Sequence, residues 1–451
     1  MNSILEMGKR SLSANQFGIN VTSHNITNAA SPGYSRQRLM VVPSAPEKLT
    51  FGYVGTGVTI QSVQRMRENY IGQQTYAVNQ NNGRAMQRQS VLSLAESYLQ
   101  EPSDTGLSAM MQEFFASFQS LSLHPEESAN RNAVVQRAQL MTGAFHRIAE
   151  SFDSLRNDMV NQAETMTGKI NMLVSSIAGL DRTIVASSAS GTPPNDLLDR
   201  RDESLNELSK LVDINVSYNT NGSVSVAVGG SMLVTGGTAT EIDTSYAGGV
   251  LQMVMKGTGN TIKVSGGTLG AVISQQNVTL TSYAAKFDQL AAALIDSVNT
   301  AHAAGYGLGT PPATGTPFFT GSDASTIDVA PAVVATPSLV AASGTGAPGD
   351  NSVALAIANL QSANLLNGGT VTAAQFYAGV VSTLGSEIEA AVTEADATAL
   401  VAEQLTTQQN AVSGVSLDEE MTNLIKYQHG FDAAARVVTA VNEMFQTILS
   451  M

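Results

Sequence analysis

The sequence contains no cysteine, and only 13% of its 451 residues are charged. The absence of cysteine excludes disulfides, thiol nucleophiles and cysteine-ligated metal sites. The sequence also lacks an apolar run of about 18 residues, which a membrane-spanning helix needs. Residues 1–26 lack the apolar core of a cleaved secretory signal. We therefore expect no membrane span, and export from the cell would proceed without a cleaved signal peptide.

Positive charge is scarce, and the formal net charge is −14 with a pI near 4.8. Nucleic acids and anionic membranes bind basic surfaces, so we expect neither as a partner. The histidines are too scattered in sequence to indicate a catalytic or metal site, and no His-Glu-x-x-His motif is present. They are His24, His124, His146, His302 and His429. We expect a protein that is not an enzyme and that binds no metal.

One glycine-rich segment, residues 344–349, matches the fingerprint of dinucleotide-binding folds. Pro348 removes a backbone N–H at a place where a phosphate needs donors. The acidic residue expected about 20 positions later is also missing. We predict that this segment is a linker and that the protein needs no cofactor.

Apolar or small residues recur in alternating steps of three and four at both ends of the sequence, as on a helix with one narrow buried face. The N-terminal stripe is Leu5, Gly8, Leu12, Asn15, Ile19, Thr22 and Ile26. The C-terminal stripe is Met421, Leu424, Gln428, Phe431, Ala435, Val438, Asn442, Phe445 and Leu449. We expect the two terminal helices to pair as a coiled coil. Periodicity alone leaves open whether the stripes pack within one subunit or between subunits.

Long helices are predicted inside these ends. The same periodicity continues from Met141 to Ile184, and the segment from Ser187 to Pro194 should end that helix. Another helix should begin after Thr372, whose side chain can form a capping box with Gln375. The last helix should begin after Ser416, with Glu419 in the reciprocal capping position. The charged residues 199–203 are interpreted as a solvated helix face.

The periodicity changes to two between residues 212 and 267, which indicates short strands. Ile214, Val216 and Tyr218 alternate with polar residues, and Asn221-Gly222 predicts a tight two-residue hairpin turn. The predicted fold is therefore mainly α with a small β insertion. Three domains are expected: a terminal coiled-coil assembly domain (1–45 and 415–451), a long-helix bundle domain (46–211 and 268–414) and an inserted antiparallel β domain (212–267).

Two segments resemble the signatures of the bacterial flagellar rod, hook and axial proteins. Residues 25–37, Asn-Ile-Thr-Asn-Ala-Ala-Ser-Pro-Gly-Tyr-Ser-Arg-Gln, are similar to the N-terminal signature of that family. Residues 413–420, Ser-Gly-Val-Ser-Leu-Asp-Glu-Glu, are similar to its C-terminal signature. The Gly-Tyr-Ser-Arg-Gln run, residues 55–58 and the Asp-Leu-Leu-Asp-Arg-Arg-Asp run at 196–202 resemble the hook-associated branch of the family.

The resemblance implies a structural adaptor that joins the flagellar hook to the flagellin filament as a ring of subunits. Its implied partners are other copies of itself, the hook protein, the next hook-associated protein towards the filament, and an export chaperone on the C-terminal helix. It further implies secretion by the flagellar type III apparatus to an extracellular position at the hook–filament junction. The alternative is a hook or rod subunit, although the long helical middle favours the junction.

The candidate assembly residues combine the two stripes with the signature turn. Asn28, Gly33, Tyr34 and Arg36 are the expected turn and contact residues, and Gly33 is expected to serve the backbone turn. The helical candidates are Leu5, Leu12, Ile19, Ile26, Leu417, Met421, Leu424, Gln428, Phe431, Val438 and Phe445.

Overall fold

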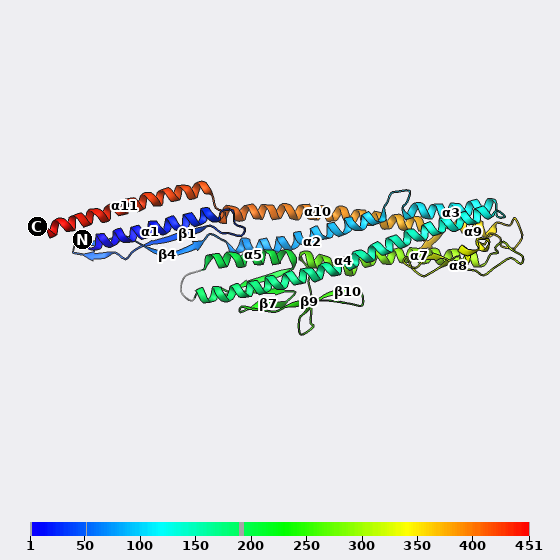
Figure 1. Ribbon diagram of the computed structural model, residues 1–451, viewed down its shortest axis with the longest axis horizontal. Coiled ribbons are helices and arrows are strands. Elements are labelled where there is room, and N and C mark those ends of the chain that lie inside the picture. Colours follow the sequence, from blue (N-terminus) through cyan, green and yellow to red (C-terminus); the bar gives the residue numbers. More distant parts are fainter. Residues whose placement is uncertain (1, 51, 189–193, 451) are drawn as a thin grey trace.

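The computed structural model describes residues 2–50, 52–188 and 194–450 as an elongated molecule made mostly of helices (Figure 1). The helices are α1 (Asn2–Asn28), α2 (Asn69–Leu99), α3 (Leu107–Leu123), α4 (Ser128–Ser188), α5 (Asn195–Leu211), α6 (Gly267–Ser274), α7 (Thr281–Ala303), α8 (Pro331–Ala335), α9 (Ser352–Asn359), α10 (Ala373–Ser413) and α11 (Leu417–Leu449). A π-helical turn, η1 (Gln275–Leu280), joins α6 to α7. The predicted fold, mainly α with a β insertion, is confirmed.

The strands fall into several small antiparallel sheets. They are β1 (Gln37–Pro43), β2 (Glu47–Leu49), β3 (Gly52–Val54), β4 (Val58–Arg65), β5 (Ile214–Tyr218), β6 (Val224–Val228), β7 (Ser231–Thr235), β8 (Thr238–Ala239), β9 (Ile242–Ala247), β10 (Val250–Met255), β11 (Thr261–Ile262), β12 (Phe319–Thr320), β13 (Asp328–Val329), β14 (Asn364–Leu366) and β15 (Val371–Thr372).

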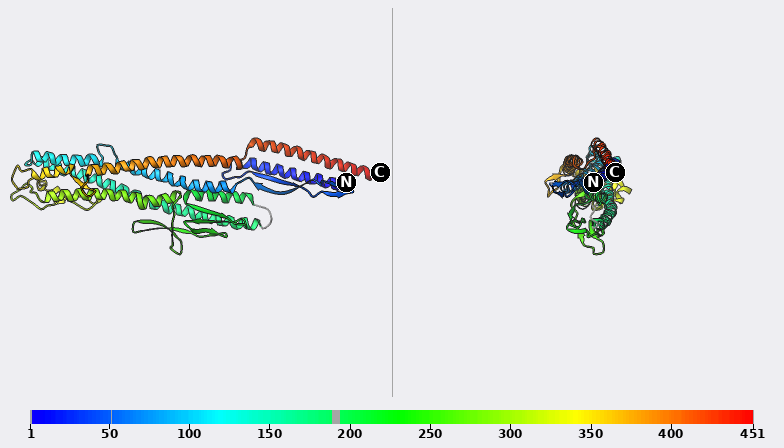
Figure 2. Two further views of the ribbon diagram at one scale, coloured as in Figure 1. Left: turned by 180° about the vertical axis from the view of Figure 1, so that it is seen from behind. Right: turned by 90° about the vertical axis from the view of Figure 1, so that its left-hand side faces the viewer.

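The two ends of the chain lie side by side at one tip of the molecule (Figures 1 and 2). Helices α1 and α11 run antiparallel there, and β1 and β4 lie along α1. Strand β4 pairs with β1 from Gln37–Arg65 to Pro43–Val58. The sequence-based prediction assigned the residues of β4 to the long-helix domain, but the structure places them beside β1. We call α1, β1–β4 and α11 the terminal domain.

The long helices form a rod that continues away from the terminal domain (Figure 2). Helix α4 has 61 residues, which corresponds to about 90 Å, and its apolar stripe is buried from Val134 to Ile184. It ends at Ser188 and α5 begins at Asn195, while residues 189–193 of the predicted break lie outside the described residues. Helix α2 packs along α10 over much of its length.

The capping box predicted for α10 is confirmed. The Gln375 backbone N–H donates to Thr372 Oγ1 at 3.1 Å, and the Thr372 N–H donates to Gln375 Oε1 at 3.1 Å. These bonds satisfy two donors that a helix N-terminus leaves without intrahelical partners.

The inserted β domain lies along α4 as two sheets, with strand orders β5-β6-β7-β8 and β11-β10-β9. The hairpin predicted at Asn221-Gly222 exists, but the two-residue turn is wrong. Tyr218 pairs with Val224, which leaves a five-residue loop. The loop is longer because Asn221 Oδ1 accepts from the backbone N–H of Ser223, so this side chain closes a turn of its own.

Two asparagine side chains connect the β11-β10-β9 sheet to the helices by hydrogen bonds. Asn171 of α4 accepts from the Ile242 N–H at 2.9 Å and donates to the Ile242 carbonyl at 2.8 Å. Asn277 of η1 makes the same pair of bonds to Leu251, at 2.8 and 2.7 Å. Each amide therefore takes the place of a neighbouring strand.

The far end of the rod holds an aromatic cluster around Phe318 and Phe319, which pack on α3. His302 lies against Phe318 and is buried. Its Nδ1 lies 2.8 Å from the Thr316 carbonyl, and its Nε2 accepts from the Ala341 N–H at 2.8 Å. Burial lowers the pKa of His302 to about 4, so the ring is neutral at pH 7.

Residues 344–349, the segment that matches the nucleotide fingerprint, form an irregular loop. The N–H groups of Gly344 and Thr345 both donate to the carboxylate of Asp350, at 2.9 Å each. Donors that a phosphate would need are therefore already bonded to a side chain of the same loop.

Candidate assembly interface

The pairing of α1 with α11 depends on glycines that let the two backbones approach closely. A Cβ added to Gly8 would lie 2.8 Å from Val438, and one added to Gly18 would lie 2.6 Å from the Tyr427 ring. Across the pair, a Cβ on Gly430 would meet the Asn15 amide. Since real Cβ contacts are not this short, a larger residue at any of these three positions would force the facing side chain or the helix to move.

The buried centre of α11 differs from the predicted stripe at every other position. Glu420, Ala434 and Val441 are buried. Of the predicted residues, Leu424, Phe431, Val438 and Phe445 are half-buried at the edge of this face, whereas Leu417, Met421 and Gln428 are exposed. At three positions of the predicted stripe, 421, 435 and 442, the buried residue is thus the preceding one: 420, 434 and 441.

Helix α1 follows its predicted stripe only in part. Gly8 and Thr22 of the stripe are buried, and so are Ala14, Gly18 and Asn25, which lie outside it. The predicted Leu5, Leu12, Ile19 and Ile26 are all half-buried beside them. Small residues occupy the centre of the contact because it is close-packed, and the larger apolar side chains flank it.

Arg36 joins the N-terminal signature to the start of α11. Its Nε donates to Glu420 Oε1 at 2.7 Å, and its Nη1 and Nη2 donate to the two Glu419 oxygens at 3.0 and 2.7 Å. The hydrogen bond with Glu419 raises the pKa of Arg36, and the same contact lowers the pKa of Glu419. The bidentate geometry orients the turn relative to α11.

The capping role predicted for Ser416 and Glu419 is wrong. The Ser416 side chain makes no capping bond. Glu419 is instead held by Arg36, a residue far away in sequence, and this contact competes with the local box. Negative charge in the first turn still suits the helix dipole.

Tyr34 and Asn25 link the turn to both helices. The Tyr34 hydroxyl donates to Asn25 Oδ1 at 2.7 Å and lies 2.9 Å from His24 Nδ1. Asn25 donates from Nδ2 to the Gln37 carbonyl at 2.8 Å and to Glu420 Oε2 at 3.1 Å. Burial and the nearby Asp196 raise the pKa of Tyr34, so the hydroxyl stays protonated and remains a donor.

The other two signature residues have local roles. Gly33 has a φ of +73°, and a Cβ there would lie 2.8 Å from the Glu203 carboxylate, so the turn requires glycine. Asn28 donates to the His24 carbonyl at 3.0 Å within its own helix. The predicted set therefore contains two residues that contact other segments, Tyr34 and Arg36, and two residues with local roles, Gly33 and Asn28.

Sequence reasoning missed Asn25 and Glu420 as contact residues. Both are polar and buried, with exposures of 1% and 2%. A helical stripe scored by apolarity gives no signal for such residues. The signal was their place in the two signatures, where each stands next to a residue that was selected.

Apolar side chains remain uncovered on the outer flanks of α11. Leu417, Met421 and Ile425 are 50–53% exposed on one flank. Val437, Met444 and Ile448 are 46–51% exposed nearer the C-terminus. Uncovered apolar surface beside a paired helix is typical of a surface for further packing.

The sequence also matches models of known protein families. The model of the family described as the flagellar hook-associated protein FlgK helical domain matches residues 92–319, half of the chain. The chain belongs to the FlgK family. A second family model, the flagellar basal body rod FlgEFG protein C-terminal, matches residues 408–451.

Relatives within the FlgK family match along the whole chain. Flagellar hook-associated protein 1 of Bacillus subtilis (strain 168) is 29% identical over 500 residues, covering 99% of this chain and 97% of the relative. The proteins of the same name from Salmonella typhimurium and Escherichia coli (strain K12) are 25% and 24% identical, with 100% of both chains covered. These names belong to flagellar proteins, and they do not support the alternative of a hook or rod subunit.

The fold agrees as well. The solved structure of the flagellar hook junction protein FlgK from Burkholderia pseudomallei is similar with a TM-score of 0.67 at 16% identity. The match covers 75% of this chain and 100% of that chain. Membership of the FlgK family thus rests on the family model, and the solved structure independently supports the fold.

Two further observations concern residues 2–50, 52–188 and 194–450. No helix there is both long and apolar enough to span a bilayer. Within the same ranges, no three His, Asp or Glu side chains are grouped so that they could hold a metal ion.

Proposed function

We propose that the protein is a structural adaptor between the flagellar hook and the flagellin filament. Subunits would form a ring through their terminal domains, with the α1–α11 pair packed against the pairs of neighbouring copies. The observation that carries the proposal is the close-packed α1–α11 pair with uncovered apolar flanks, in a chain of the FlgK family. Each buried Leu, Ile or Met side chain contributes about 1.5–3 kcal/mol, so a few such contacts suffice for association.

The three domains expected from sequence have distinct roles in this proposal. The terminal residues, 1–45 and 415–451, assemble the ring together with strands β2–β4, which the structure adds to them. The rest of the long-helix domain, expected at 46–211 and 268–414, extends outward from it, and the insertion at 212–267 lies on the flank of the rod. The expected assembly residues are those of α1, α11 and the signature turn.

The partners follow from the same position. The ring would contact the hook protein on one side and the next hook-associated protein on the other. The exposed apolar flanks of α11 need cover before assembly, which suits an export chaperone on this helix. The protein would be secreted without a cleaved signal peptide and would act outside the cell, without enzymatic activity.

Deletion of the gene tests the proposal. Electron microscopy should show intact hooks without filaments, and flagellin should be lost to the medium. Missing hooks would instead indicate a hook or rod subunit. Normal filaments in the deletion strain would contradict a junction role.

A further inference from the structure

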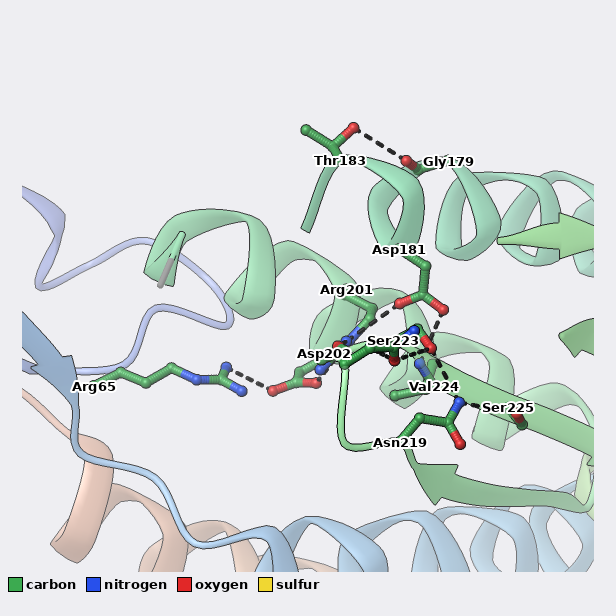
Figure 3. A network of polar contacts seen from close by, with 12 residues as sticks. Arg65, Gly179, Asp181, Thr183, Arg201, Asp202, Asn219, Ser223, Val224 and Ser225 are labelled. Atoms are coloured by element: carbon green, nitrogen blue, oxygen red, sulfur yellow. Dashed lines mark hydrogen bonds and ion pairs between the residues drawn. The ribbon is translucent and has the colours of Figure 1, made fainter. Parts of the chain in front are cut away.

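A chain of buried ion pairs crosses the molecule where the terminal domain meets the rod (Figure 3). The charged residues 199–203 were interpreted as a solvated helix face, and for three of them this is wrong: Asp199, Arg201 and Asp202 are at most 5% exposed. Apart from the contact between Arg201 and Asp202, their ion-pair partners come from other elements, so i,i+4 pairing within α5 does not account for them. We call the connected set Asp181, Arg201, Asp202, Arg65, Arg67 and Asp199 the ion chain.

One end of the ion chain holds the terminal domain. Arg65, at the end of β4, donates to Asp202 at 2.6 Å and to Asp199 at 3.0 Å. Arg67 pairs with Asp202 at 3.2 Å. Asp199 in turn accepts from the backbone N–H of Ser35 at 3.0 Å, in the signature turn. We call the signature turn, together with residues 65–68 that lead from the end of β4 to α2, the elbow.

The other end reaches the inserted β domain. Arg201 pairs with Asp181 of α4 at 3.2 Å and donates to the Gly222 carbonyl at 2.7 Å, in the loop between β5 and β6. Asp181 also accepts from the Val224 N–H at 3.0 Å. Figure 3 shows Arg201 between Asp181 and Asp202, with the β5–β6 loop beside it. The longest step, 3.7 Å, joins Arg201 to Asp202, which are consecutive residues of α5.

The ion chain is balanced in charge. Three arginines face three aspartates, and the side chains of all six are at most 13% exposed. Burial raises the pKa of Asp181, while Val224 and Arg201 oppose that shift by stabilising its charged form. Removing one partner leaves an uncompensated buried charge, whose penalty the remaining members share.

We propose that the inserted β domain stabilises the elbow through the ion chain. The β5–β6 loop orients Arg201 and Asp181, and Arg201 neutralises one side of Asp202. Asp202 is then able to hold Arg65 and Arg67 of the elbow. Arg201 and Asp181 are positioning residues, since neither contacts the terminal domain. The insertion thereby acquires a role in setting the orientation in which the terminal helices leave the rod.

The test is hydrogen exchange of the Ser35 amide in the free chain carrying Asp181→Asn. This change removes a negative charge next to Arg201, on the insertion side of the chain. We expect exchange at Ser35 to accelerate by about tenfold or more, because breaking a buried ion pair is strongly destabilising. The matched control is Asn171→Ala, which releases β9 from α4 outside the ion chain. It should accelerate exchange at Ile242 and leave Ser35 unchanged.

Two results would overturn the proposal. In the first, Asp181→Asn accelerates exchange at Val224 but not at Ser35, so that the two ends behave as separate clusters. In the second, Asn171→Ala loosens Ser35 as much as Asp181→Asn does, which would show general destabilisation. Both readouts use the unassembled chain, so they are independent of the proposed function.

The unmodified chain provides a second measurement if Asp181→Asn does not fold. Exchange at Ser35 and Val224 is followed in increasing, sub-denaturing urea. One shared opening event predicts that the two amides reach the same opening free energy and urea dependence. Distinct opening events with different urea dependences would also overturn the coupling.

Discussion

Arg36 and Glu420 are separated by 384 residues in sequence and joined by a hydrogen bond of 2.7 Å. Glu420 is 2% exposed and also accepts from Asn25, so its carboxylate depends on partners from the N-terminal segment. The start of α11 is thus fixed by residues at the other end of the chain.

Arg36→Ala should destabilise the terminal domain by about 3–5 kcal/mol, because it leaves the Glu420 carboxylate buried without a cation. Urea unfolding measures this loss. The matched control is Lys9→Ala, which removes an exposed ion pair with Glu6 and should cost less than about 1 kcal/mol. Equal effects of the two substitutions would show that the Arg36 contact is no stronger than a surface pair.

Gly18→Ala should destabilise the α1–α11 pair by about 1–3 kcal/mol, because the new methyl group would collide with the Tyr427 ring. The control is Gly168→Ala in α4, where a Cβ meets nothing within 4 Å. There alanine should stabilise the helix by up to about 1 kcal/mol. Thermal unfolding of both variants compares the signs, and a stabilising effect at position 18 would contradict the close packing.

Ile425→Asp should leave the subunit folded and prevent assembly, since Ile425 is 50% exposed on a flank of α11. The circular dichroism spectrum of the variant should be unchanged, and its free energy of unfolding should change by no more than about 0.5 kcal/mol. Cells that carry the variant should lack filaments and release flagellin. Thr422→Asp, at an exposed polar position of the same helix, is the control and should assemble. Leu424→Asp, by contrast, should also lower subunit stability because Leu424 is half-buried. Normal filaments with Ile425→Asp would exclude this flank from the ring contacts.

The stability of the rod should fall with acid between pH 6.5 and 4 because of His302. Its pKa is about 4 when folded and 6.5 in the reference state, so the unfolded chain binds more protons in this interval. The contribution is complete above pH 6.5 and is lost as the pH falls towards 4, a change of about 3 kcal/mol. Urea unfolding of the wild type and of His302→Gln across this range measures it. Parallel curves for the two proteins would assign the pH dependence to other groups.

Two capping patterns show what local sequence can and cannot predict. The box at Thr372 and Gln375 was predicted correctly, whereas the equivalent pattern at Ser416 and Glu419 was not. The pattern is the same in both places. The difference is Arg36, which arrives from a distant part of the chain and takes the carboxylate of Glu419.

The terminal stripes show a related limit. Periodicity predicted both helices and the face on which they pair, but not the centre of that face. Gly18 lies at the centre because the two helices are close, and it was missed because glycine has no apolar side chain for a pattern to detect. In the same way, the burial of Asp202 depends on Arg65 and Arg67, which no local rule connects to α5.

The antiparallel pairing of α1 with α11 also means that the terminal domain can form only in a chain that contains both helices. Translation produces α1 long before α11, so the glycine contacts cannot form until α11 has also been made. A prematurely terminated polypeptide lacks α11 and leaves α1 and the signature turn without Glu420, Tyr427 and Val438. Such a product would be unable to offer the paired surface to a growing structure.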